Sequence, residues 1–156
     1  MNRAAAPRAT VAIAFALAVL PAIADGNLMR VPLLPRYQQE CAACHLAYPP
    51  GLLPAASWQR LMAGLDKHYG TDASLDEASV RQIGGWLKSH AGTYKRVNEE
   101  PPQDRITRSA WFERKHRKVA PEVWKRASVR SAANCVACHS GADKGDYGDD
   151  GVRIPR

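Results

Sequence analysis

The sequence reads CAACH at Cys41–His45 and CVACH at Cys135–His139, and these two stretches contain all four cysteines of the 156-residue chain. Both have the pattern C-x-x-C-H, in which a histidine directly follows two cysteines that are separated by two residues. A structural disulfide makes no use of that histidine. The repeated pattern therefore indicates two sites of the same kind, each built from two cysteines and one histidine.

Three kinds of site compete for such a pattern. A zinc site made from two C-x-x-C pairs usually separates them by about 15–20 residues, whereas 90 residues lie between Cys44 and Cys135. A thioredoxin-like dithiol needs a strand–helix–strand setting, and neither motif has one. Covalent attachment of haem c explains every residue, because two sulfurs bind the haem vinyl groups and the histidine binds the iron. The residues expected to hold two haem c groups are Cys41, Cys44 and His45 in the first motif and Cys135, Cys138 and His139 in the second.

Residues 1–24 have the three parts of a secretory signal peptide. Arg3 and Arg8 precede an unbroken apolar run, VAIAFALAVL at 11–20, and an A-x-A cleavage pattern follows it. The run is shorter than the roughly 20 apolar residues of a transmembrane helix. An uncleaved membrane anchor is the alternative. We expect export, cleavage near Asp25 and no membrane span in the mature chain.

The mature sequence predicts an all-α protein with two haem-binding lobes, because apolar residues recur at helical spacing and no run alternates as strands do. Ser57 is the expected N-cap of a helix that Gly70 ends. The other helices are expected over 34–45, 72–92 and 109–119, and loops over 48–54 and 141–156. The expected organisation is an N-terminal lobe at 25–97, a linker at 98–103 and a C-terminal lobe at 104–156. The linker sequence, NEEPPQ, consists of polar residues and proline.

The sixth ligand of each iron is a choice that helical spacing leaves open. His45 and His139 are the expected fifth ligands. Histidine with methionine raises the reduction potential, two histidines leave it lower, and an open position allows oxygen or peroxide chemistry. The candidates in the mature chain are His68, His90, His116, Met29 and Met62.

Four longer stretches carry a resemblance to a known family. They are CAACHLAYPPGLLPAASWQRLMAGLDKHYGTDASLD at 41–76, PPQDRITRSAWFERKH at 101–116, ANCVACH at 133–139 and VRIPR at 152–156. With these stretches the chain resembles the dihaem cytochromes c, which are periplasmic electron carriers of purple and related bacteria. The resemblance covers almost the whole mature chain.

The resemblance implies a helical fold whose first lobe is like a class I cytochrome c and whose second lobe is short and irregular. It also implies that both haems have two histidine ligands. The second ligands would be the histidines of HYG and WFERKH, which are His68 and His116 in this sequence, while His90 matches no position of the family pattern. The implied redox partners are a membrane cytochrome b of the b561 type or a monohaem oxygen-binding cytochrome c.

The formal net charge is +7, and residues 108–130 hold eight Lys or Arg against two Glu. Nucleic acid is one partner for such a run, but an exported haem protein rarely meets any, so we expect no nucleic-acid partner. The run is then either a solvated helix face or a docking surface for an acidic redox partner.

Electron transfer between redox partners is the function that these features predict, without enzymatic activity. The alternative is a haem enzyme or sensor, acting on peroxide or a small gas, in which one distal ligand dissociates. A dihaem peroxidase needs a much longer chain and an accessible iron, which favours the carrier.

Mass spectrometry tests the attachment directly. Protein exported from a host that matures haem c should begin near Asp25 and carry the added mass of two haems, because both motifs are complete. Free thiols, bound zinc or a disulfide at the motifs would contradict the prediction.

Overall fold

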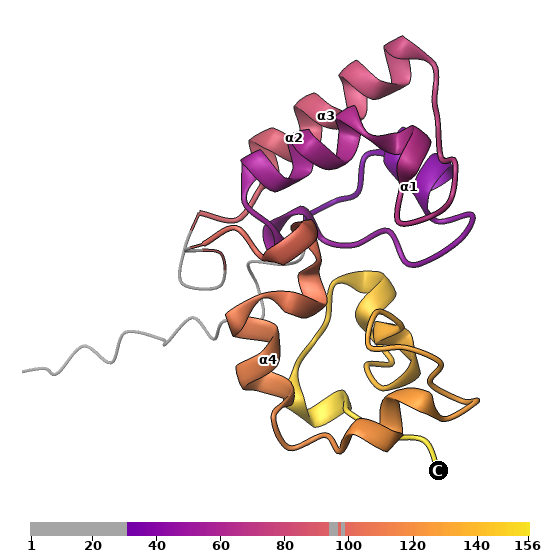
Figure 1. Ribbon diagram of the computed structural model, residues 1–156, viewed down its shortest axis with the longest axis vertical. Helices are drawn as coiled ribbons and strands as arrows, with labels where there is room; N and C mark the ends of the chain where they lie inside the picture. The colour runs from indigo at the N-terminus through magenta and orange to yellow at the C-terminus, as the bar shows by residue number, and fades with distance from the viewer. Residues whose placement is uncertain (1–30, 94–96, 98) are drawn as a thin grey trace, which may run out of the picture.

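The structure is a computed structural model that describes residues 31–93, 97 and 99–156 (Figure 1). The predicted signal peptide and Met29 lie outside the described residues. Within them the chain forms helices and two isolated bridges but no strand, which confirms the predicted all-α fold class. No helix in this part of the chain is long and apolar enough to cross a membrane.

Figure 1 shows two parts of the chain one above the other, and we call residues 31–93 the first lobe and residues 104–156 the second lobe. The first lobe contains three α-helices, and the second contains one together with most of the short 3₁₀ helices. The α-helices are α1 (Pro35–Cys41), α2 (Ala55–Ala63), α3 (Glu77–His90) and α4 (Ala110–His116). The 3₁₀ helices are η2 (Pro50–Leu52), η3 (Leu65–Lys67), η4 (Pro102–Asp104), η5 (Ile106–Arg108), η6 (Pro121–Lys125), η7 (Cys135–Ala137), η8 (Ala142–Lys144) and η9 (Asp149–Gly151).

The core of the first lobe lies between its three α-helices, with α2 and α3 side by side (Figure 1). Leu53, Ile83 and Leu87 are each no more than 1% exposed, and Trp58 packs with them. The indole Nε1 of Trp58 donates a hydrogen bond of 2.7 Å to the Pro50 carbonyl oxygen. That bond fastens η2, which follows the first motif, to the core.

The helix predicted over 72–92 is confirmed as the shorter α3. Its buried residues Ile83 and Leu87 are four positions apart, as expected for a helix with one face on a core. Asp76 is its N-cap, and the carboxylate accepts hydrogen bonds from the Ser79 backbone N–H at 3.0 Å and from the Ser79 hydroxyl at 2.6 Å. These bonds satisfy a backbone donor that the first turn leaves without a partner.

The helix predicted after Ser57 is wrong at both ends. α2 already includes Ser57, which is fully buried inside the helix and is not its N-cap. The helix ends early because Gly64 leaves the helical region, at φ −123° and ψ 32°. After η3 the chain turns through Tyr69 and Gly70, whose φ values are 51° and 98°. His68 therefore lies on a turn and not on a helical stripe.

Smaller differences concern the predicted loops and α4. The stretch 48–54 contains η2, which has a proline at its first position, where a helix tolerates it. The tail 141–156 contains η8 and η9 between loop segments. The helix predicted over 109–119 is the shorter α4, and the Ser109 hydroxyl accepts a hydrogen bond from the Phe112 backbone N–H at 3.2 Å.

Gly92, just after α3, has no room for a side chain. A Cβ there would lie 2.6 Å from the Gly51 carbonyl oxygen and in close contact with a Val97 methyl group. The Gly92 backbone N–H also donates to the Leu53 carbonyl at 2.9 Å, which holds this segment in place. We expect Gly92→Ala to lower the free energy of unfolding by about 1–3 kcal/mol, measured by urea denaturation followed by circular dichroism.

Gly85 provides the control, because a Cβ there meets nothing within 4 Å. It lies inside α3, so Gly85→Ala should be neutral or stabilise the protein by up to about 1 kcal/mol. Equal unfolding free energies for the two variants would show that Gly92 is not packed as described.

Candidate haem-binding sites

The first C-x-x-C-H motif lies where α1 ends. Cys41 is the last residue of the helix, and the following turn carries Cys44 and His45. The Nδ1 atom of His45 lies 2.7 Å from the Leu46 carbonyl oxygen. An Nδ1–H that donates to this carbonyl leaves the Nε2 lone pair available for a metal. Tyr48 stacks on the same imidazole, with ring centres 5.0 Å apart and 23° between the planes.

His68 faces His45 across the first site. The centres of the two rings are 6.1 Å apart, with 24° between the planes. Two backbone hydrogen bonds close the turn that carries His68. Thr71 N–H donates to the His68 carbonyl at 3.0 Å, and Ala73 N–H donates to the Leu65 carbonyl at 2.8 Å. The turn therefore presents one imidazole to the other.

The second motif has a matching partner in His116. Its ring centre is also 6.1 Å from that of His139, with 73° between the planes. His116 is the last residue of α4, where its Nδ1 atom lies 2.9 Å from the Phe112 carbonyl oxygen and the Phe112 ring stacks on it at 3.9 Å. On the other side, the backbone N–H of Arg153 donates to the Cys138 carbonyl at 2.9 Å. The C-terminal segment thus holds the second motif in place.

Burial favours the neutral form of two of these imidazoles. It lowers the pKa of His68 and of His139, and the facing histidine is the second cause in each case. Neutral imidazole is the form that binds metals. The Nδ1 atoms of the same two rings are buried without a hydrogen-bond partner among the described residues. Because buried polar atoms are normally paired, a water molecule or another group from outside the polypeptide would pair with each of them.

The four motif cysteines form no disulfide with one another. Burial raises the pKa of Cys41 and of Cys135 to about 11, so both stay protonated at neutral pH. With no disulfide between them, the two cysteines of each motif are both available for attachment of a haem through sulfur.

The two other described candidates make different contacts. The Nδ1 atom of His90 lies 2.9 Å from the carbonyl oxygen of Trp86 in the same helix, and the two rings are 5.1 Å apart. Met62 packs against the core of the first lobe. Among the described residues, the ring of His68 lies next to that of His45 in the first motif, and the ring of His116 lies next to that of His139 in the second.

Tyr48 links the two sites, although the sequence analysis did not single it out. Its hydroxyl donates to the Ala133 carbonyl at 2.8 Å, two residues before Cys135. The Tyr37 hydroxyl in turn donates to the Tyr48 carbonyl at 2.8 Å. No pattern in the sequence marks Tyr48, because its bond to Ala133 spans 85 residues.

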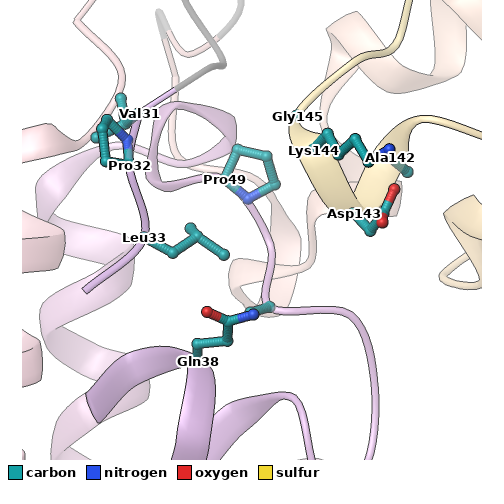
Figure 2. A pocket seen from close by; sticks show the side chains of 10 residues that line it. Val31, Pro32, Leu33, Gln38, Pro49, Ala142, Asp143, Lys144 and Gly145 are labelled. Carbon is teal, nitrogen blue, oxygen red and sulfur yellow. The ribbon is translucent and has the colours of Figure 1, made fainter. Parts of the chain in front are cut away.

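A hollow of about 360 Å³ lies between the two lobes (Figure 2). Residues 31–33 and Pro49 line it from the first lobe, and residues 142–145 line it from the second. A second hollow of about 260 Å³ shares part of this lining and reaches both His45 and Val136, which lies between the cysteines of the second motif. This second hollow therefore borders residues of both motifs.

The family model of dihaem cytochrome c matches residues 37–147, which include both motifs and both histidine pairs. The chain belongs to the dihaem cytochrome c family. This membership confirms the resemblance seen in the sequence and the prediction of two covalently attached c-type haems. Cys41 with Cys44 and Cys135 with Cys138 provide the two attachment pairs.

Solved structures agree with this assignment. The crystal structure of DHC purified from Rhodobacter sphaeroides is 46% identical over 75% of this chain and 99% of that chain, with a TM-score of 0.65. A diheme cytochrome c from the same organism is 44% identical over 75% and 98%, with a TM-score of 0.67. A diheme cytochrome c from Shewanella baltica OS155 is 36% identical over 80% and 95%, with a TM-score of 0.70. The search of curated proteins gave no match.

Proposed function

We propose that this dihaem cytochrome c is an exported electron carrier in which His45 and His68 hold one iron and His139 and His116 hold the other. When bound, each haem supplies an iron that gains or loses one electron. Family membership supports electron transfer as the task. The signal-peptide pattern of residues 1–24 supports export to the periplasm.

The observation that carries the ligand assignment is the same ring separation, 6.1 Å, in both histidine pairs. Bonds from a first-row metal to imidazole nitrogen are about 2 Å long, so a metal between two imidazoles places the ring centres about 6 Å apart. The residues of both lobes therefore fit a metal held between two rings. The packing of Met62 against the core favours a structural role for this residue.

Two histidines per iron favour a carrier over an enzyme. If both histidines bind the iron, no position on it would remain for peroxide, oxygen or another small molecule. The carbonyl groups of Leu46 and Phe112 fix the orientation of one ring in each pair. A haem enzyme or sensor is the second candidate, and the position of His68 on a turn favours it, because a turn holds a ligand less firmly than a helix.

The contact between the lobes supports electron exchange inside the protein. Tyr48 stacks on His45 and donates a hydrogen bond to the segment just before Cys135. These contacts keep the two motifs close to each other in the folded chain. We propose that electrons enter at one haem and leave from the other.

The surface of α4 supports docking of an acidic partner. Arg114, Lys115, Arg117 and Lys118 are all exposed, and they surround His116 in the sequence. A positive surface of this kind attracts an acidic protein and raises the rate of encounter. We propose a redox protein as the partner, with a membrane cytochrome b of the b561 type or a monohaem oxygen-binding cytochrome c as the first to test.

Substitution of the histidines tests the ligand set. His68→Ala should make the first haem high-spin and His116→Ala the second, because each change removes one axial imidazole. His90→Ala is the matched control and should leave absorption and electron paramagnetic resonance spectra unchanged. The assignment is wrong if His90→Ala gives a high-spin haem and His68→Ala does not. A sulfur-to-iron band in the ferric spectrum would instead indicate Met62.

The docking surface predicts a salt-dependent reaction with the redox partner. The electrostatic screening length falls from about 10 Å at 0.1 M salt to about 3 Å at 1 M, so stopped-flow electron transfer should slow markedly over this range. Charge reversal at Lys115, Arg117 and Lys118 should slow it at low salt, whereas Lys88→Glu on α3 should have a smaller effect. Rates that do not change with salt would show that the basic run is only a solvated face.

A further inference from the structure

The turn that carries His68 is fastened to the segment between the lobes. First, an ion pair outside the haem site joins α2 to this segment. The Nε and Nη2 atoms of Arg60 on α2 donate to the two carboxylate oxygens of Asp104 at 2.9 Å and 2.6 Å, and Nη2 also donates to the Glu100 carboxylate at 2.7 Å. The Asp104 side chain is only 15% exposed. The Arg60 side chain is 50% exposed, so the strength of this pair comes from its forked geometry, in which two parallel bonds join one guanidinium to one carboxylate.

Tyr69, next to His68 in sequence, makes the second part of the attachment. Its hydroxyl donates a shared hydrogen bond to the carbonyl oxygens of Gln103, at 3.0 Å, and of Asp104, at 3.1 Å. The Arg105 guanidinium lies 4.1 Å from the centre of the Tyr69 ring, within the range of a cation–π interaction. On the other side, the centre of the Tyr69 ring is 4.9 Å from that of His68.

Left-handed backbone is concentrated at this contact. The φ values are 51° at Tyr69, 54° at Gln103 and 54° at Asp104. Residues with a Cβ rarely adopt such values, and the surroundings must hold them there. The hydrogen bonds of the Tyr69 hydroxyl join these three residues directly, so each strained segment is held by the other.

The two predicted distal histidines are held in different ways. His116 ends a helix and has a hydrogen-bond partner in the Phe112 carbonyl. His68 lies outside the helices, and its Nδ1 atom is buried without a partner among the described residues. Its orientation therefore depends on the turn and on Tyr69. We refer to Arg60, Tyr69, Glu100, Asp104 and Arg105 together as the interlobe junction.

We propose that the interlobe junction positions His68 on the iron of the first haem, so that breaking the junction releases this ligand while the second haem keeps both of its own. This inference rests on the proposed pair of histidine ligands. Arg60 and Tyr69 are positioning residues, because they act on the haem site only through the turn that carries His68.

Carbon monoxide binding to the reduced protein tests the proposal, since it requires an axial position to open. We expect Arg60→Ala to raise the fraction of the first haem that binds carbon monoxide by about ten-fold, at the low end of the range for outer-shell partners of metal ligands. Tyr69→Phe, which removes one oxygen atom, should act in the same direction. Arg60→Lys should fall between Arg60→Ala and the wild type, because lysine keeps the charge but not the fork.

Arg81→Ala is the matched control. Arg81 is also an exposed helical arginine in an ion pair, at 3.2 Å from Glu77, but it lies outside the junction and should leave carbon monoxide binding unchanged. In a His68→Ala background, Arg60→Ala should cause no further change, because the ligand on which it acts is already absent. A further increase there would overturn the proposal, as would opening of the second haem in the single variants.

The spectrum of the wild type separates this inference from the proposed function. If both haems of the wild type are bis-histidine and Tyr69→Phe and Arg60→Ala bind no more carbon monoxide than the wild type, the junction has no positioning role and the ligand set stands. If the wild type lacks His68 ligation, both proposals fail. Should Arg60→Ala not fold, Tyr69→Phe decides the outcome.

Discussion

If the proposed histidine pairs hold the two irons, the separation of the two imidazole rings is a constraint that both parts of the fold have to meet. It is 6.1 Å in both lobes, although unlike local structures produce it. Each motif histidine is fixed next to its own cysteine pair by the C-x-x-C-H spacing. The chain can therefore vary only in how it delivers the second imidazole, from a helix end at His116 and from a turn at His68. Under the proposed ligand set, a helix end and a turn are two ways of meeting the same geometric requirement.

Only part of the described chain forms an apolar core. A cluster of buried side chains lies between α1, α2 and α3. In the second lobe, Phe112, Val123 and Val129 are buried among 3₁₀ helices and turns. Short 3₁₀ helices have poor hydrogen-bond geometry and are not stable alone. Since small domains with little core need another source of stability, we expect the covalently attached haems to supply part of it.

The features that the sequence predicted correctly depend on residues close together in the chain. The C-x-x-C-H spacing identified the attachment residues, and the four-residue spacing of Ile83 and Leu87 identified α3. The end of α2 was missed because apolar spacing continues through Gly64 while the backbone does not. For the same reason, helical spacing alone could not decide whether His68 or His90 is the second ligand of the first iron. The family resemblance distinguished them, and contacts between distant residues supply the physical difference.

The two proposed distal histidines also differ in whether near or distant residues in the sequence hold them. His116 is oriented by a carbonyl only four residues away, within the helix that carries it. The bonds that fasten the His68 turn join residues 34 to 44 positions apart, from Tyr69 to Gln103 and from Arg60 to Asp104. Bonds between distant residues exist only while the lobes are packed together, whereas a bond within one helix can survive local opening. A change in lobe packing would therefore reach His68 first. If the segment around Asp104 stays firmly against α2, His68 stays in place, as an electron carrier requires. If this contact opens easily, His68 can leave the iron, as a ligand-releasing sensor requires.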